Sequence, residues 1–572
     1  MAMAMMQRFR SFPLWPAGAF LVFAILHFAL LYHPGLARLD DFGYLHNAVE
    51  TIVRGRPYTH DFLSPYSATT SVLSALAYAA TGDFPGATWG LLSLFACGNF
   101  FLLYLLFRGR LASREAAILA LAAATIPAYW YKCSEYTGTV FTLTFVLAAL
   151  LAYRRGSWAW FFPAAFLAFA NRQNSIALMA LPAYHLFFDA RLSPAGKRFL
   201  AAGLAGFAAA CMALHLSMNH TASQTRDIDP HIGFGKALLI ARTCFIGICI
   251  GLALLSFFGL LSGKSPGANL RANRKRPWAP LAASLLFAAL LLPGSGPFFR
   301  PHTYVEFCTP LLLDMDAHNR LQWVLGLCVP LLLWTLDWKQ AFRFNGPACL
   351  FIAYVAISAQ RGFWYDFYFI DLALAILFII LAAPEPMRPA RWAPGLTCLL
   401  LLANAAWGYG YKVLAEKESL YLRTYERLER SENLGVDRMT SAPWGYLGWK
   451  LYDHHALHTP DDPGKGFGCY LMGEQVVVET QLPWRRTFKR GGVPEGAEIL
   501  EAGSARIGFF RVPFRVMDMR RPGIIPGNPS CYLPLDRAAY QPRPFPLDAG
   551  EWSSHIAARR RAFSAQALKQ PR

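Results

Sequence analysis

Two adjacent carboxylates, Asp40 and Asp41, follow the first membrane-length apolar segment of the chain. Holding like charges this close raises the proton affinity of at least one of them, and a carboxylate that titrates nearer neutral pH can act as a general base. The alternative is that both are solvated acids of a surface loop. The dipeptide alone does not separate these two interpretations, so the elements around it matter.

The composition of the chain predicts a membrane protein. Of its 572 residues, 55% are hydrophobic and only 16% are charged, and the mean hydropathy is +0.30. The formal net charge of +19 would suit a nucleic-acid partner, but no binding signature and no basic patch interleaved with aromatic residues accompanies it. We therefore expect no nucleic acid and attribute the basic charge to short loops that set the membrane topology.

Apolar runs predict an α-helical polytopic membrane protein with about thirteen transmembrane segments. Lys and Arg are concentrated in alternate connections, which predicts a cytoplasmic N-terminus, with an uncleaved first helix in preference to a signal peptide. The loop that carries Asp40 and everything after residue 411 then lie on the outer side. A shorter apolar run, 67–80, is assigned to an interfacial helix. The predicted segments are 15–33, 87–107, 115–131, 138–153, 158–171, 174–188, 199–217, 237–261, 278–293, 321–338, 346–360, 367–383 and 392–411.

Cationic residues on the predicted outer side are candidates for binding an anion. Arg172 lies among Asn and Gln side chains between two short apolar runs, so it should form the outer tip of a helix pair, where it either binds a phosphate or has a purely structural role. Most acidic residues before residue 412 fall on the same side. Further candidate substrate-binding residues there are Lys132, Glu135, Arg242, Arg300 and Arg361.

The sequence after residue 411 predicts a soluble outer domain, residues 412–572, of mixed α/β or mostly β structure. It begins with a charge-rich amphipathic helix and includes the strand-like runs EQVVVET and ARIGFFRVPF. Cys469 and Cys531 could form a disulfide there, although sequence alone does not show their proximity. The run DHHALHTPDD could ligate zinc or form a solvated loop, and we assign no metal to the site.

The order of these motifs resembles the GT-C superfamily of polyprenyl-phosphate-dependent glycosyltransferases. The resemblance is carried by DDFGYLHNAVETIVRGRPY after the first helix and by TGDFPGATWGLLSLFACGNFFLLYLLFRGR after the interfacial helix, and it is closest to protein O-mannosyltransferases and aminoarabinose transferases. It implies that Asp40 is the base that deprotonates the acceptor, with Asp41 beside it, and that Arg172 binds the donor phosphate. Glu135 matches the second family acid only loosely.

The sequence thus predicts two domains, 1–411 and 412–572, and a membrane glycosyltransferase with Asp40 and Asp41 as its catalytic residues. The donor would be a polyprenyl-phosphate-linked sugar and the acceptor a glycan, lipid or protein on the outer side, in contact with membrane lipids. We assign no cofactor, and the sequence leaves a divalent cation open. The expected location is a bacterial inner membrane with a periplasmic C-terminal domain. The alternatives are a transporter or flippase for a lipid-linked or anionic solute and a scaffold without catalytic activity.

Overall fold

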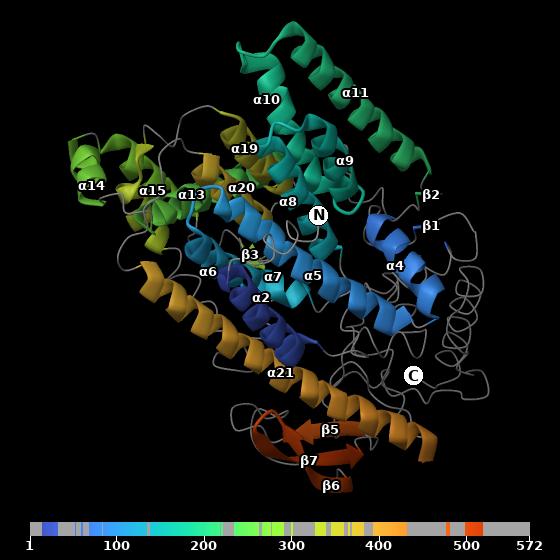
Figure 1. Ribbon diagram of the computed structural model, residues 1–572. Helices are drawn as coiled ribbons and strands as arrows, with labels where there is room; N and C mark the ends of the chain where they lie inside the picture. Colours follow the sequence, from blue (N-terminus) through green and yellow to red (C-terminus); the bar gives the residue numbers. More distant parts are fainter. Residues whose placement is uncertain are drawn as a thin grey trace.

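The computed structural model is mostly helical (Figure 1). It describes residues 14–32, 52, 59–60, 68–82, 84–133, 138–217, 219–220, 234–261, 266–275, 277–290, 299–300, 327–338, 345–359, 364–365, 369–382, 393–431, 476–480 and 498–518.

Within these residues, four helices are long and apolar enough to cross a membrane. They are α2 with its π-helical extension η1 (Leu14–Leu26 and His27–Leu31), α5 (Phe84–Arg108), α11 (Pro194–Ser217) and α13 (Phe234–Leu261). Shorter apolar helices include α8 (Thr139–Arg154), α9 (Trp158–Phe169), α15 (Trp278–Leu290) and α19 (Gly346–Ala359). These helices are compatible with a multi-pass membrane protein. The count of thirteen spans stays a prediction.

The predicted segment 115–131 is not one helix. The chain forms α6 (Ser113–Ala124) and α7 (Pro127–Lys132), separated by Thr125 and Ile126. The physical cause is Pro127, because a proline lacks an N–H and disfavours helical geometry in the residue before it. Asn404 occupies the break: its Nδ2 donates to Thr125 Oγ1 at 3.1 Å.

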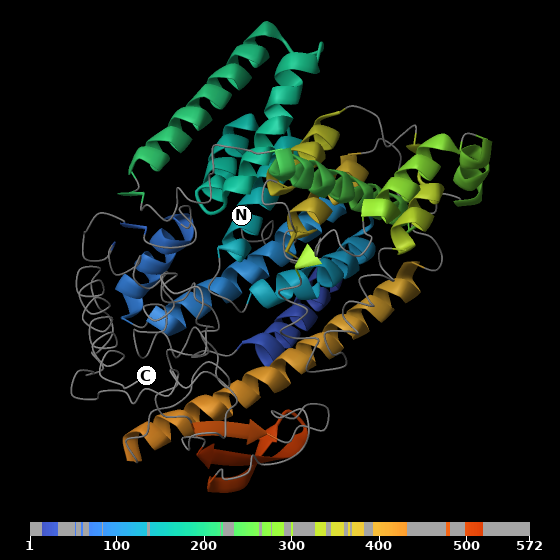
Figure 2. The same ribbon diagram turned by 180° about the vertical axis from the view of Figure 1, so that it is seen from behind.

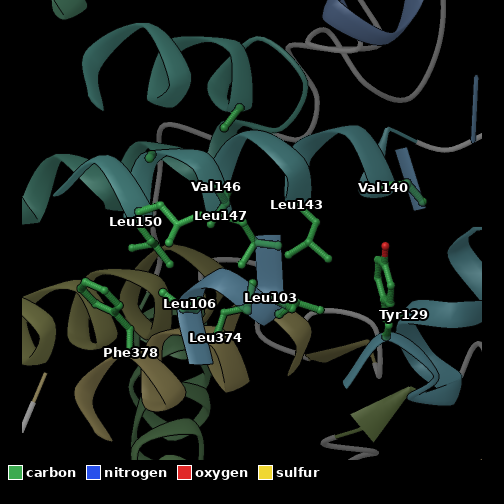
Figure 3. Close-up of a cluster of buried hydrophobic side chains, with 14 of the residues drawn as sticks. Leu103, Leu106, Tyr129, Val140, Leu143, Val146, Leu147, Leu150, Leu374 and Phe378 are labelled. Carbon is green, nitrogen blue, oxygen red and sulfur yellow. The ribbon is translucent and has the colours of Figure 1, made fainter. Parts of the chain in front are cut away.

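The core is formed around α8, most of whose side chains are buried. Figure 3 shows Leu147 and Leu150 of α8 facing Leu106 of α5 and Leu374 of α20 (Phe369–Ala382). All four belong to one cluster of buried residues. Because α8 is enclosed by its neighbours, the position of its first turn is fixed by the whole bundle.

Arginine side chains close one end of the bundle, which we call the arginine end. Arg154 Nη1 donates to the carbonyl of Leu106 near the end of α5, at 2.6 Å, and Arg110 Nε donates to that of Leu381 near the end of α20, at 2.8 Å. Cations stabilise the carbonyl-rich, electronegative C-terminus of a helix. A Cβ at Gly109 would lie 1.7 Å from Arg154 Nη2, so a larger residue there would displace the guanidinium.

Two short parallel ladders join loops that are distant in sequence. β1 (Thr59–His60) pairs with β2 (Asn219–His220), and β3 (Phe299–Arg300) pairs with β4 (Trp364–Tyr365). Each ladder brings together two loops that the topology prediction places on the outer side. The remaining helices described below are α4 (Ala68–Thr81), η2 (Gln173–Met179), α10 (Ala180–Phe188) and α14 (Pro266–Lys275).

The long helix α21 (Ala393–Ser431) crosses the predicted domain boundary at residues 411 and 412 without a break. A three-stranded antiparallel sheet lies along its second half (Figure 1), and Figure 2 shows the same arrangement from behind. The strands are β5 (Val476–Thr480), β6 (Glu498–Ile507) and β7 (Phe510–Asp518). The run EQVVVET contains the predicted strand, whereas ARIGFFRVPF is a hairpin that turns at Gly508 and Phe509. A separate C-terminal domain stays a prediction.

Candidate functional site

The predicted helix pair around Arg172 is present. The start of α9 lies beside the end of α10, since the rings of Trp158 and His185 are 5.6 Å apart. The two helices therefore run in opposite directions and turn at residues 170–172. Arg172 is extended, with φ −149° and ψ 121°, which ends the α-helix before η2 begins. The turn places Arg172, half-buried, at the tip of the pair.

The turn caps the N-terminus of α4, which is about one hundred residues earlier in the chain. The Ala68 N–H donates to Ala170 O at 3.0 Å. Both the N–H and the hydroxyl of Thr70 donate to Asn171 Oδ1, at 2.9 and 2.8 Å. The first N–H groups of a helix have no partner within it and need an external acceptor. Asn171 supplies that acceptor from another part of the fold.

The N-terminus of α8 reaches the same place. A Cβ added to Gly138 would lie 3.3 Å from Thr70 Oγ1 and 3.6 Å from Asn171 Cγ, so the three residues are in close contact. Asn99 of α5 holds the first turn of α8, because its Nδ2 donates to Val140 O at 3.0 Å and to Tyr129 Oη at 2.9 Å. We call this junction of α4, α8 and the α9–η2 turn the polar end.

The electrostatics of the polar end favour an anion. Each helix N-terminus carries a partial positive charge of about half an electron, and two of them converge here. Arg172 adds a full charge. Lys132 ends α7, just before the connection to α8, and is only 3% exposed, so its charge is held inside the protein.

Three buried donors at or near this junction have no hydrogen-bond partner among the described residues. They are the hydroxyls of Ser71 and Ser74 on α4 and the Nδ2 group of Asn171. Buried polar groups in proteins are nearly always hydrogen-bonded. We therefore treat these donors as candidate hydrogen-bond partners for a bound polar group.

Cys133, directly after Lys132, does not supply a nucleophile. Burial raises the pKa of its thiol to about 12. The thiolate is the reactive form of cysteine, and it is scarce at physiological pH when the pKa is this high. Among the described residues, the polar end offers cations and hydrogen-bond donors.

The other predicted site residues have different outcomes. Arg242 Nε and Nη2 donate to Leu290 O at 3.2 and 3.0 Å, so the guanidinium caps the end of α15. The backbone of Arg300 pairs in register with Tyr365, which brings its loop to the loop that contains Arg361. Outside the described residues lie Asp40, Asp41, Glu135, Arg361, Cys469, Cys531 and the histidines of DHHALHTPDD.

Sequence reasoning missed the two residues that organise the junction, Thr70 and Asn99. The available signals were a Thr-Thr-Ser run at the start of an apolar helix and an asparagine inside a membrane-length one. A polar residue in such a segment needs a partner in the protein. The partners, Asn171 and Val140, are too distant in sequence to be inferred without the fold.

Comparisons with protein-family models, with curated proteins and with solved structures find no match for this chain. In the part of the chain that the structure describes, no group of three or more His, Cys, Asp or Glu residues is arranged to hold a metal ion.

Proposed function

We propose that this chain is a membrane glycosyltransferase that moves a sugar from a polyprenyl-phosphate donor to an acceptor on the outer side of the membrane. The observation that carries the proposal is the polar end, where Arg172 and the N-termini of α4 and α8 converge. Such a junction suits a phosphate group, because helix dipoles and a guanidinium favour negative charge.

The reaction requires a base for the acceptor and positively charged groups for the departing phosphate. The acceptor oxygen or nitrogen attacks the anomeric carbon, the bond from that carbon to the phosphate oxygen breaks, and its electron pair stays on the phosphate. The acceptor proton passes to a carboxylate, for which we propose Asp40 assisted by Asp41. Arg172 and the helix N-termini would stabilise the charge that develops on the leaving phosphate. Secondary candidates for binding the donor are Lys132, Glu135, Arg242, Arg300 and Arg361.

The contacts between helix ends support the alternating topology. Two hydrogen bonds, from Arg154 to Leu106 O and from Arg110 to Leu381 O, join helix ends that the topology assigns to the cytoplasm. The hydrogen bond from Thr70 to Asn171 joins two helix ends that the topology assigns to the outer side. The arginine end would then face the cytoplasm, in agreement with the preference of Lys and Arg for cytoplasmic loops. The polar end would face the periplasm, on the same side as the loop of Asp40.

The experiment is transfer of radiolabelled sugar from a panel of polyprenyl-phosphate donors in membranes. Asp40→Asn should abolish transfer. Arg172→Gln should reduce it by at least about tenfold, the effect of losing one charge-assisted interaction of about 1.4 kcal/mol or more. Arg114→Gln is the matched control, because that arginine is exposed at the start of α6, on the side that the topology assigns to the cytoplasm, and should leave transfer close to the wild-type level.

The outcomes separate the competing functions. Transfer by the wild type that stops in Asp40→Asn supports the general base. If the wild type transfers no label from any donor of the panel, the enzyme proposal fails, and a flux assay with the same lipids tests a transporter. If Arg172→Gln loses only expression, the structural role of the turn explains the residue.

A further inference from the structure

The tip of the β6–β7 hairpin is fixed to one point on α21. The Phe509 N–H donates to Tyr409 Oη at 2.8 Å, and the two rings stack with centroids 4.9 Å apart. The Gly508 N–H donates to the Glu416 carboxylate. Gly508 has φ +60°, and a Cβ there would lie 2.5 Å from Tyr409 Oη, so both the turn and the contact require glycine. The tip therefore has a defined position along the helix.

That position is level with the end of the first apolar span. Lys412, one turn beyond Tyr409, donates from Nζ to the carbonyl of Ala29 at 2.9 Å. Ala29 lies in η1, two residues before the span Leu14–Leu31 ends. The sequence of α21 changes at the same level, from exposed leucines such as Leu402 to Trp407, Tyr409, Lys412 and Glu416. Aromatic residues followed by charges mark the boundary between hydrocarbon and water.

The hairpin tip presents a large apolar side chain at this boundary. Phe509 is 80% exposed despite stacking on Tyr409. An exposed aromatic ring next to the end of a membrane span has a favourable environment in the interfacial layer of the bilayer.

Two arginines flank Phe509 and face each other across the hairpin. Arg506 and Arg511 are paired directly in the register of β6 and β7, and both are exposed. Arg506 Nε donates to Gly508 O and Arg511 Nε to Ser504 Oγ, and no carboxylate of the described residues contacts either guanidinium. Like charges directly opposite each other destabilise a hairpin. An anionic lipid headgroup would offset that repulsion.

We propose that the β6–β7 hairpin tip binds the outer leaflet of the membrane, with Phe509 in the interfacial layer and Arg506 and Arg511 on anionic headgroups. The inference uses the proposed topology but neither Asp40 nor Arg172, so it can fail separately from the glycosyltransferase proposal. It assigns the sheet a lipid contact that holds it close to the bilayer beside α21.

The test is photo-crosslinking to lipid in nanodiscs with the full chain. A photoreactive p-benzoyl-phenylalanine replaces Phe509 in one variant and Ile499 in a control. Ile499 is also an exposed apolar residue, 48% exposed, but lies about 26 Å away along β6 at about 3.3 Å per residue. We expect at least a tenfold higher yield of lipid adducts at position 509. Equal yields at both positions, or adducts at 509 only with protein, would overturn the proposal.

Lipid composition tests the role of the arginines. The yield at position 509 should rise at least threefold when phosphatidylglycerol is added to phosphatidylcholine nanodiscs, and the rise should disappear in the Arg506→Gln, Arg511→Gln variant. A yield that does not respond to lipid charge would overturn the headgroup contact. Size-exclusion elution and the thermal midpoint of every variant report folding, which these exposed positions should leave unchanged.

Discussion

Replacing Asn171 by alanine tests the junction on which the proposed site depends. Its Oδ1 accepts hydrogen bonds from the N–H and the hydroxyl of Thr70, and both residues are 1% exposed. Removing the acceptor leaves two buried donors without a partner, each at a cost of roughly 1–2 kcal/mol. We therefore expect Asn171→Ala to lower the free energy of unfolding by about 2–4 kcal/mol.

The matched variants isolate the hydrogen bonds from the change in volume. Asn171→Asp retains the acceptor and places a negative charge near two helix N-termini, which offsets part of the cost of burying a carboxylate, so its loss should be smaller than that of Asn171→Ala. Thr70→Val removes only the hydroxyl. In a double-mutant cycle with Asn171→Ala, it should show a coupling energy of about 0.5–1.5 kcal/mol.

Equilibrium unfolding in mixed micelles with increasing sodium dodecyl sulfate provides the measurement, with tryptophan fluorescence as the signal. A destabilisation below about 0.5 kcal/mol for Asn171→Ala would refute the capping argument. So would a coupling energy within about 0.3 kcal/mol of zero, because independent sites add to within that margin.

Three further predictions concern other parts of the fold. Gly251→Val should destabilise the protein by about 1–3 kcal/mol, because a Cβ would lie 2.3 Å from the Phe351 ring; thermal unfolding of the purified variant measures it, and an unchanged midpoint would contradict this packing. Hydrogen bonds from His185 and from a backbone N–H lower the pKa of Asp189. Its stabilising contribution is therefore present above the unfolded pKa of about 3.9 and is lost as the pH falls through the lower folded value. Asp189→Asn should flatten the fall in stability at acid pH, and an unaltered pH profile would count against the hydrogen bonds. Arg242→Gln should cost about 1–2 kcal/mol, since its two hydrogen bonds cap α15; an unfolding curve identical to that of the wild type would refute the cap.

The positions of the helices could be predicted from the sequence, because apolar runs of this length have few other structures open to them. The interfacial run 67–80 coincides with α4, and the turn at Arg172 follows from two short apolar runs on either side of polar residues. The prediction of one segment, 115–131, was wrong, because it did not take into account that Pro127 ends the helix before it.

The contacts within the site could not be predicted from the sequence. Thr70 and Asn171 are separated by about one hundred residues, and no local pattern pairs a threonine in one helix with an asparagine in a distant turn. Arg242 was predicted to bind an anion, but the carbonyl of Leu290 satisfies part of its hydrogen-bonding capacity. Charge alone does not show whether a cation in a membrane protein meets an anion or the end of a helix.

Because α21 is one unbroken helix, a tilt near its attachment points displaces its far end. Asn404 and Lys412 attach the helix to the break before α7 and to the end of the first span. From Lys412 the helix continues for nineteen residues to Ser431, about 28 Å at 1.5 Å per residue. A tilt of about 10° at the membrane would move the far end by about 5 Å. A small rotation of the first span that α21 followed would therefore be amplified at the far end of the helix.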